Sequence, residues 1–246
     1  MSLPRFYAPA LDPRAGEVAL PPDEARHLTR VLRLVVGDEV AVFDGRGTQF
    51  RARVSSAMRD GVRLVLLAPS APAPESRVPL TLAQAVLKGD KMDDVVRDAT
   101  MLGAAAIIPL VTAHAAVPAR AARAGVDRWT RIAIASAKQC GRAVVPVVSP
   151  PLALAEWFGA DRATVRFLLV EPSAEAPSGA AELRGMPPPA SVSLTVGPEG
   201  GWAAPEIASA RAAGYRSATF GRRTLRADAV GLAALAIAGF LWDRDP

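Results

Sequence analysis

The stretch of sequence most informative about the fold is SVSLTVGPEGGWAAP, residues 191–205. Its first six residues are mainly apolar or β-branched, which is typical of a strand covered on both faces in a parallel sheet. The glycines that follow let the backbone turn sharply and approach a ligand closely. Because a proline is well suited to the first turn of a helix, the stretch predicts a strand, a loop and a helix in succession.

Runs of the same kind recur on both sides of this stretch and alternate with helical patterns. The further strands that we expect are LTLAQAVL, AAIIPLV, VVPVV, RFLLV and SATF, beginning at residues 80, 105, 144, 166 and 217. The helices that we expect cover residues 92–101, 127–140 and 154–158, a segment after Pro205 and one after Arg226. This alternation predicts an α/β domain with a parallel sheet. Open sheets of this kind bind ligands beyond the carboxyl ends of their strands, so the site should involve the loops after Val86, Ile108, Val196 and Phe220.

The first part of the chain follows another pattern. Residues 23–35 predict an amphipathic helix, because apolar side chains recur at helical spacing at Leu28, Val31, Leu32 and Val35. Runs at 40–43, 49–54 and 62–67, separated by turns, predict a small β-barrel. The segment APSAPAPESRVP that follows is typical of a linker. We therefore expect a small domain over residues 1–72, a linker over 73–79 and a larger domain over 80–246.

Composition sets broad limits on function. The 246 residues carry a formal charge of +5, which permits a polyanionic partner without requiring one. The single cysteine, Cys140, excludes an intramolecular disulfide and a cysteine-based metal cluster, which favours a reducing compartment. The N-terminal residues lack the apolar run of a secretory signal, and the longest apolar stretch, 229–242, is too short to span a bilayer. These features predict a soluble cytoplasmic protein.

The loop Gly197-Pro198-Glu199-Gly200-Gly201 is the first candidate site. It differs from the GxGxxG fingerprint of dinucleotide binders, and the sequence contains no GxxxxGK[ST] phosphate loop. Glu199 would place a negative charge where a pyrophosphate should lie. A cationic or zwitterionic nucleoside therefore fits this loop better than a nucleotide does, although a tight turn with an exposed glutamate remains an alternative interpretation.

Two groups of arginines are candidates for RNA contacts. Arg222, Arg223 and Arg226 follow the expected strand SATF, where they could clamp RNA and stabilise an anion. Asp228 could act beside them or only complement the dipole of the following helix. A second group, Arg26, Arg30 and Arg33, recurs at intervals of four and three residues and predicts a stripe that contacts RNA phosphates.

Other chemistries find little support in the sequence. His27 and His114 are the only histidines, and neither stands in a metal-ligand spacing, so no metal is expected. We interpret His27 as a solvated neighbour of the arginine stripe and His114 as a loop residue. Cys140 continues a helical pattern and is interpreted as a buried structural thiol rather than a nucleophile.

Several segments together closely resemble the RsmE family, which methylates N3 of a uracil in 16S (small-subunit) ribosomal RNA. The segments are LTVGPEGGW, TFGRRTLRADAVGLAALA, HLTRVLRLVVGDEVAVFDGRG, LKGDKMDDVVRDATMLGAAAIIPLVT and RWTRIAIASAKQCGRAVVPVV, which cover nearly the whole chain in the family's order. The resemblance implies a PUA-like β-barrel followed by a SPOUT-type α/β domain with a trefoil knot. It also implies a homodimer, S-adenosyl-L-methionine as methyl donor, and 16S ribosomal RNA or the small ribosomal subunit as partner.

The resemblance also maps the methyl donor onto three loops of this chain. The implied contact residues are Pro109, Leu110, Val196, Gly197, Pro198, Glu199, Gly200, Gly201, Phe220, Gly221, Thr224, Leu225, Arg226 and Ala229. The sequence departs from the family's usual pattern at Met101, at Ala135 and at Ala227-Asp228-Ala229. These departures remove hydroxyls and shorten or delete acids, so they bear on individual polar contacts.

The expected reaction must remove a proton from the uracil N3 and stabilise the resulting charge. We assign the stabilisation of this negative charge to Arg226. Glu199 and Asp228 are the candidate proton acceptors, and the sequence does not rank them. Two other interpretations stay open at this point. One is an RNA-binding protein of the same fold with another RNA target or with decayed catalysis, and the other is an α/β enzyme that uses a nucleotide phosphate.

Overall fold

The computed structural model describes residues 3–58, 61–172 and 179–243. It divides into two compact units, each of which is described by itself. The first unit comprises Met1–Glu75 and Ile134–Val145, and the second comprises Ser76–Ala133 and Pro146–Pro246. The long helix α3, Ala119–Cys140, contributes residues to both units.

The first unit is built around a five-stranded sheet with the order β1-β3-β4-β5-β2. The strands are β1 (Arg5–Tyr7), β2 (Glu17–Ala19), β3 (Glu39–Phe43), β4 (Gln49–Met58) and β5 (Gly61–Pro69). Strands β3, β4 and β5 pair antiparallel, whereas β1 runs parallel to β3. Phe6, Leu28 and Leu64 are fully buried in the core of this unit. The β-rich first domain expected from the sequence is therefore confirmed.

The expected amphipathic helix over residues 23–35 is wrong beyond its first turns. Helix α1 covers only Pro22–Arg26, and a π-helical turn, η1, continues over His27–Val31. The chain then leaves helical geometry, because Arg33 adopts a left-handed conformation with φ of 55°. The expected apolar face is consequently broken. Leu28 is buried, but Val31, Leu32 and Val35 are exposed.

Residues 134–145 are held within the first unit by largely buried ion pairs. Lys138 Nζ donates to both carboxylate oxygens of Glu24 at 2.8 and 2.7 Å. The Arg142 side chain, only 4% exposed, pairs with Glu75, and Arg5 donates to the Arg142 carbonyl at 2.6 Å. Because removing one partner would leave a buried charge uncompensated, these pairs hold the segment in one arrangement.

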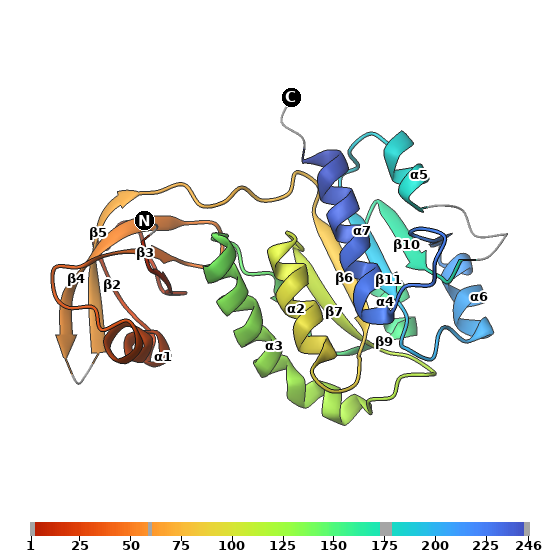
Figure 1. The fold of residues 1–246 in the computed structure, drawn as a ribbon, viewed down its shortest axis with the longest axis horizontal. Helices are drawn as coiled ribbons and strands as arrows, with labels where there is room; N and C mark the ends of the chain where they lie inside the picture. Colours follow the sequence, from red (N-terminus) through yellow and green to blue (C-terminus); the bar gives the residue numbers. More distant parts are fainter. Residues whose placement is uncertain (1–2, 59–60, 173–178, 244–246) are drawn as a thin grey trace. The chain divides into compact units, whose positions relative to one another are not determined.

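The second unit contains a parallel sheet with the order β12-β10-β11-β6-β7-β8, in which β9 also pairs with β7. Strands β10, β11, β6, β7 and β9 of this sheet are labelled in Figure 1. Its strands are β6 (Leu80–Ala85), β7 (Ala106–Val111), β8 (Val147–Val148), β9 (Leu152–Ala153), β10 (Val165–Leu169), β11 (Val192–Val196) and β12 (Arg216–Ala218). Every pairing in this sheet is parallel. All five residues of β11 are buried, as the apolar character of SVSLTV predicts.

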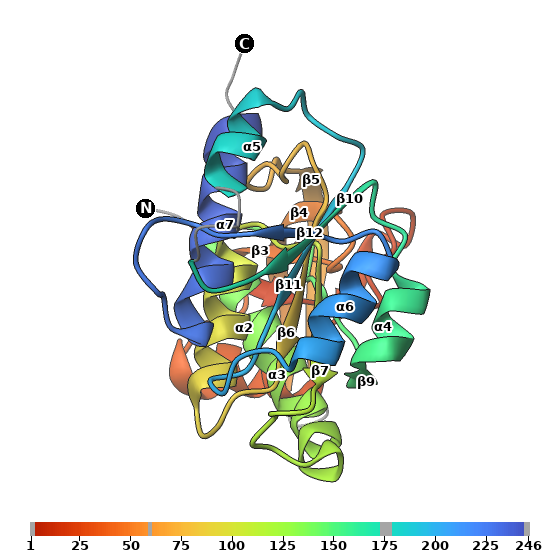
Figure 2. The ribbon, with the colours of Figure 1, turned by 90° about the vertical axis from the view of Figure 1, so that its right-hand side faces the viewer.

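Helices cover both faces of this sheet. Helix α2 (Lys91–Met101) and helix α7 (Ala227–Trp242) lie on one face, and α4 (Leu154–Ala160) and α6 (Ala204–Ala212) lie on the other (Figure 2). A short helix, α5 (Gly179–Gly185), contacts α7. Helix α7 approaches β6 and β11 closely at Gly231, where a Cβ atom would lie 2.9 Å from Leu82 Cδ1. The alternation expected from the sequence is thus confirmed.

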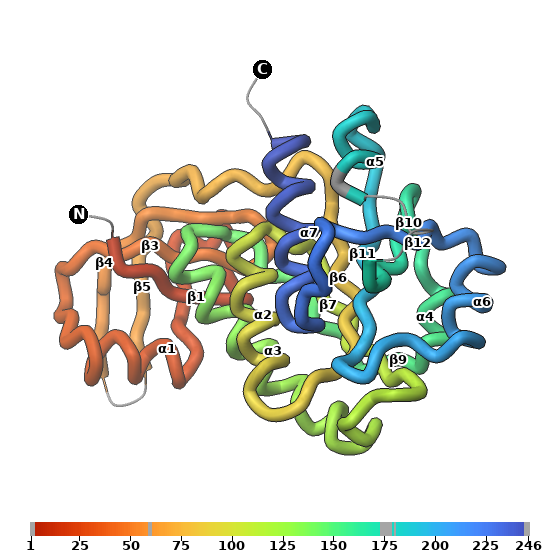
Figure 3. The backbone as a smooth tube through the Cα atoms, turned by 45° about the vertical axis from the view of Figure 1, so that its right-hand side comes forward, coloured from red at the N-terminus to blue at the C-terminus, as the bar shows by residue number. Residues whose placement is uncertain are grey.

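The connection from β12 to α7 can be followed in Figure 3. Strand β12 lies at the edge of the sheet beside β10, whereas α7 contacts the central strands β11 and β6. Residues 219–226 must therefore return from the edge to the middle of the sheet, and they do so beyond the carboxyl ends of the strands. This return places the FGRRTLR segment beside the loop that follows β11.

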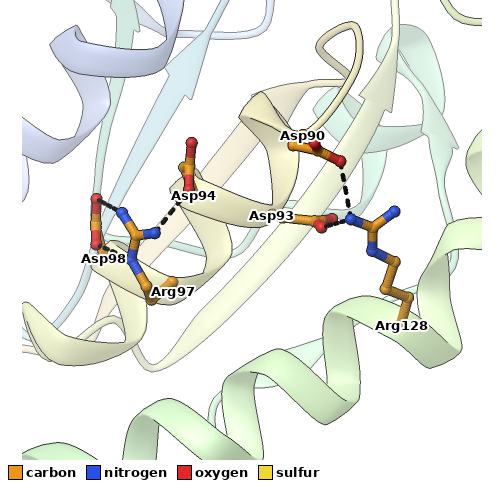
Figure 4. Close-up of polar contacts among 6 residues, drawn as sticks. All are labelled: Asp90, Asp93, Asp94, Arg97, Asp98 and Arg128. Carbon is orange, nitrogen blue, oxygen red and sulfur yellow. Dashed lines mark hydrogen bonds and ion pairs between the residues drawn. The ribbon is translucent and has the colours of Figure 1, made fainter.

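Acidic side chains of α2 and the loop before it hold the first half of α3 (Figure 4). Arg128 pairs with Asp90 at 2.9 Å and with Asp93, and Trp129 Nε1 donates to Asp93 at 3.1 Å. On the other side of α2, Arg97 pairs with Asp94 and Asp98 at the surface. The indole of Trp129 is buried, so Asp93 satisfies a donor that water does not reach.

We expect Asp93→Ala to destabilise the second unit. The substitution leaves the buried Trp129 N–H without its acceptor, which should lower the free energy of unfolding by about 1–3 kcal/mol. Asp94→Ala is the matched control, because it removes only an exposed ion pair and should change the free energy of unfolding little. Urea titration followed by circular dichroism measures both changes. Equal midpoints for the two variants would contradict the anchoring role of Asp93.

Candidate functional site

A cavity of about 680 Å³ opens where strands β10, β11 and β12 end. Its walls come from the ends of those three strands, the loops that follow them, helix α6 and the start of α7. The loops after Val196 and Phe220 were expected at the site, and both line this cavity. The sheet thus presents its carboxyl ends to a hollow large enough for a nucleoside-sized ligand.

The GPEGG loop is held by the aromatic residue that follows it. Trp202 Nε1 donates to the Leu169 carbonyl at 2.8 Å, so the loop after β11 is tied to the end of β10. Gly197 lies against the indole, where a Cβ atom would come within 3.0 Å of Trp202 Cε2. Gly201 has a φ of +72°, and its amide donates to the Pro198 carbonyl at 3.0 Å. Gly197 is therefore required by its close packing against Trp202, and Gly201 is favoured by its left-handed backbone conformation.

Glu199 points back toward the loop that follows β6. Its carboxylate accepts from Lys91 Nζ at 2.9 Å. Burial raises the pKa of Glu199, but hydrogen bonds from Lys91 and from the backbone amides of Glu199 and Lys88 outweigh it, so the pKa lies below the usual range. Glu199 is thus ionised at neutral pH, and it joins the two loops rather than standing free in the cavity.

Arg226 and Asp228 form an ion pair at the start of α7. Arg226 precedes the first residue of the helix, and its Nε and Nη2 donate to the two Asp228 oxygens at 3.0 and 2.6 Å. The Arg226 side chain is 72% exposed, and its Nη1 takes no part in the pair with Asp228. A cation and a carboxylate are thereby held side by side at the cavity wall.

Most residues that the sequence singled out for the site do line this cavity. They are Val196, Gly197, Pro198, Glu199, Gly200, Gly201, Phe220, Arg223, Thr224, Leu225, Arg226 and Asp228. Pro109, Leu110, Gly221, Arg222 and Ala229 lie outside its lining, and Pro109 and Leu110 are buried within β7. Arg26, Arg30 and Arg33 belong to the first unit, where all are exposed. Roles in binding and catalysis stay predictions for all these residues.

Sequence reasoning missed one wall of the cavity. This wall is formed by the last residue of β10 and the residues after it, together with residues of the loop after β11, helix α6 and strand β12. They are Leu169, Val170, Glu171, Pro172, Trp202, Ile207, Arg211 and Ser217. The run RFLLV was expected as a strand, so its carboxyl end could have been added to the loops to inspect. No glycine-rich motif marks this loop, so the sequence alone does not distinguish it from other loops.

A second, shallower hollow lies on the other side of the GPEGG loop. It is lined by Lys88, Lys91, His114, Ala116, Glu199 and Gly200. His114 Nδ1 lies 3.2 Å from both the Gly200 and the Gly201 carbonyl oxygens. His114, in the loop that follows β7, therefore contacts the GPEGG loop. The position of His114 in the sequence did not indicate this contact.

Metal chemistry finds no centre in the part of the chain that the structure describes. No group of His, Cys, Asp or Glu side chains there could hold a metal ion. Cys140, which was expected to be buried, is partly exposed, and its Sγ donates weakly to the Ala137 carbonyl at 3.8 Å. Within residues 3–58, 61–172 and 179–243, no helix is long and apolar enough to cross a membrane.

Comparison with known families defines the class of this chain. Residues 74–239 match the model of an RNA methyltransferase domain, and residues 20–67 match that of an RNA methyltransferase PUA domain. The fold and the matches thus define an RNA methyltransferase with an appended PUA domain. The chain belongs to the ribosomal RNA small subunit methyltransferase E family, which confirms the resemblance drawn from its motifs.

Individual relatives agree with this assignment. A ribosomal RNA small subunit methyltransferase E of Synechocystis is 34% identical over 221 residues, 89% of this chain and 71% of the relative. That of Mycobacterium bovis is 30% identical, over 97% of this chain and 92% of its own. The crystal structure of the enzyme from Neisseria gonorrhoeae bound to S-adenosyl methionine superposes with a TM-score of 0.87, at 30% identity and 98% coverage of both chains.

Proposed function

We propose that this protein transfers a methyl group from S-adenosyl-L-methionine to N3 of a specific uracil in 16S ribosomal RNA. The observation that carries the proposal is the cavity at the ends of β10, β11 and β12, which brings the GPEGG loop and the Arg226–Asp228 pair together in one site. The family assignment supports the substrate class. The Neisseria relative, solved with S-adenosyl methionine, supports the methyl donor.

The residues of the cavity fit such a donor. Apolar side chains at Leu169, Trp202, Ile207 and Phe220 can cover an adenine ring, and charged side chains also line the cavity. The GPEGG loop lacks the glycine spacing of a phosphate cradle, and its one charged side chain is an acid, Glu199, paired with Lys91. This lining suits a cationic nucleoside and argues against the alternative of a nucleotide phosphate cofactor.

The bound donor supplies an activated methyl group on a sulfonium, so the protein's task is to position and ionise the base. Uracil N3 carries a proton and becomes nucleophilic only when that proton leaves. The exposed donors of Arg226 can stabilise the negative charge that then develops on the neighbouring oxygens. The target base must be unstacked to enter the cavity, which is the usual way that proteins read RNA bases.

Asp228 is the better candidate for accepting the proton. Glu199 is engaged by Lys91, whose Nζ donates to its carboxylate at 2.9 Å. Asp228 is held by Arg226, the residue that we place against the uracil oxygens. Proton removal and charge stabilisation would thus occur side by side at the start of α7.

We place RNA binding in residues 1–72 and catalysis in residues 80–246, joined by 73–79. The matches to a PUA domain over 20–67 and a methyltransferase domain over 74–239 support this division. Arg222 and Arg223, beside Arg226, add cationic groups next to the cavity, and Arg223 lines it. RNA would therefore meet arginines in both domains.

The first-domain arginines give a test of RNA binding. Replacing Arg26, Arg30 and Arg33 with alanine should weaken binding of small-subunit RNA and flatten its dependence on salt. For every phosphate that the protein no longer neutralises, the slope of log K against log salt should fall by roughly 0.7–0.9. Filter binding at several salt concentrations measures both quantities. An unchanged affinity and slope would remove these arginines from the binding surface.

A homodimer in the cytoplasm, with a trefoil knot in its catalytic domain, completes the proposal. The family resemblance supports the dimer and the knot, and the single cysteine favours a reducing compartment such as the cytoplasm. Helix α7 has Asp228 as its one charged residue, which favours burial against another subunit. Light scattering should give about twice the chain mass of 25.7 kDa at micromolar concentration. A mass of one chain would contradict the dimer.

The proposed reaction is tested with the purified protein, labelled S-adenosyl-L-methionine and small-subunit ribosomal RNA. Label should enter the RNA, and mass spectrometry of the digested RNA should identify 3-methyluridine. Ribosomal RNA from a strain that lacks the gene should carry an unmodified uridine at the same position. Binding of RNA without transfer of label would instead favour an RNA-binding protein with decayed catalysis.

A further inference from the structure

The strongest unassigned feature is Glu171, in the wall of the cavity that sequence reasoning missed. Strand β10 ends at Leu169, which pairs with Val196 of β11 and with Ala218 of β12. The Val170 amide still donates to the Ala218 carbonyl at 3.0 Å. The next residue, Glu171, therefore emerges from a fixed backbone between the two loops that form the site.

The charge of Glu171 is not neutralised as those of the other cavity carboxylates are. Glu199 is held by Lys91 at 2.9 Å and Asp228 by Arg226 at 2.6 Å. Glu171 is exposed and lines the cavity, and it forms no hydrogen bond or ion pair within residues 3–58, 61–172 and 179–243. Its oxygens are therefore available to a ligand.

The surroundings of Glu171 indicate which part of a ligand it meets. The Leu169 carbonyl, two residues earlier, receives the Trp202 indole N–H, so an apolar wall adjoins Glu171. If a purine is covered by that wall, its sugar can reach the Glu171 carboxylate, which lines the same cavity. A carboxylate accepts two hydrogen bonds in the geometry that a ribose 2′,3′-diol offers, as acidic residues do in dinucleotide sites.

We propose that Glu171 binds the ribose hydroxyls of the methyl donor and so selects a ribonucleoside. This inference rests on the proposed function, because it names a contact within the same cavity. The side chain acts on binding and position, not on the proton transfer. Replacing it should raise the KM for the donor and leave kcat nearly unchanged.

The decisive experiment compares three ligands by calorimetry: S-adenosylhomocysteine, 5′-methylthioadenosine and 2′-deoxy-5′-methylthioadenosine. Glu171→Ala should weaken the first two to a similar extent, roughly ten- to hundredfold, because hydrogen bonds to a charged group are removed. The wild-type protein should bind the deoxy ligand more weakly than its ribose counterpart. The variant should bind both equally, since the partner of the missing hydroxyl is gone.

Controls separate this inference from the function on which it rests. Asp127→Asn removes an exposed carboxylate of α3 outside the cavity and should change none of the affinities. If Glu171→Ala weakens the affinity for S-adenosylhomocysteine but not that for 5′-methylthioadenosine, Glu171 contacts the amino-acid part of the donor and the ribose contact is overturned. Unchanged affinity for both ligands would also overturn the ribose contact. Failure of the wild-type protein to bind S-adenosylhomocysteine would instead overturn the proposed function.

Discussion

Arg226→Ala should lose methyl transfer by a factor of about 100 or more while still binding S-adenosylhomocysteine. Removing one donor from an oxyanion hole costs roughly 100- to 1000-fold in turnover, and Arg226 is proposed to act in the same way on the uracil oxygens. The Arg226 side chain is 72% exposed, and its Nη1 is not used in the pair with Asp228, so it can reach the base. Because the charge exists only in the transition state, affinity for the donor should change little.

Single-turnover methylation with saturating RNA distinguishes this effect from weak RNA binding, because excess RNA compensates a loss of affinity only. Arg226→Lys should recover little, since an ammonium cannot replace the planar fork that bonds both Asp228 and a ligand. Arg184→Ala is the matched control, because Arg184 is an exposed arginine of α5 outside the cavity lining. A near-normal rate in Arg226→Ala would assign the role to another arginine, with Arg223 tested next.

The fold of the second unit could be predicted because its strands are chemically distinctive. A strand such as β11, covered on both faces, must be apolar throughout, and that requirement is visible in SVSLTV. The helix over residues 23–35 was wrong because its apolar periodicity continues into a loop, where Val31 and Val35 are exposed. Strands of three residues, such as β1 and β2, are too short to show a period.

The site was predictable where a motif marks it and not where only tertiary structure does. The glycines of GPEGG and the arginines of FGRRTLR are visible in the sequence, and both segments line the cavity. Glu171 follows an ordinary apolar strand, so only the order β12-β10-β11 reveals that it lies between those two loops. The contact of His114 with Gly200 is likewise revealed only by the tertiary structure.

Asp161 belongs to a buried polar network that no sequence pattern reveals. It follows α4 and is only 5% exposed. Its carboxylate accepts from the hydroxyls of Ser193 and Tyr215 and, at 2.9 Å, from the Ala163 amide. One side chain thus joins the end of α4 to strand β11 and to the residue before β12. Every group of such a network must be satisfied, because a buried unpaired donor is costly.

Asp161→Ala should therefore be among the most destabilising substitutions in the second unit. It leaves two buried hydroxyls and an amide without their acceptor, which should lower the free energy of unfolding by about 3 kcal/mol or more. Tyr215→Phe, which keeps the ring packed on Phe158 and removes one donor, should cost only about 1 kcal/mol. Urea denaturation compares the two, and equal losses would show that the carboxylate does not organise the network.

Alkaline pH gives an independent measurement of the same contact. Burial and the hydrogen bond to Asp161 raise the pKa of Tyr215 above its ordinary value of 10.0. A raised pKa in the folded state means that the stabilisation is complete below about pH 10 and is lost as the pH rises further, because the unfolded chain releases its proton first. Tyr215→Phe should make unfolding less sensitive to pH above 10.

The pKa of Tyr7, the other tyrosine, is raised chiefly by burial, so part of the pH dependence should persist in the variant. An identical alkaline slope in wild type and Tyr215→Phe would show that this phenol ionises as readily in the folded protein as in the unfolded chain.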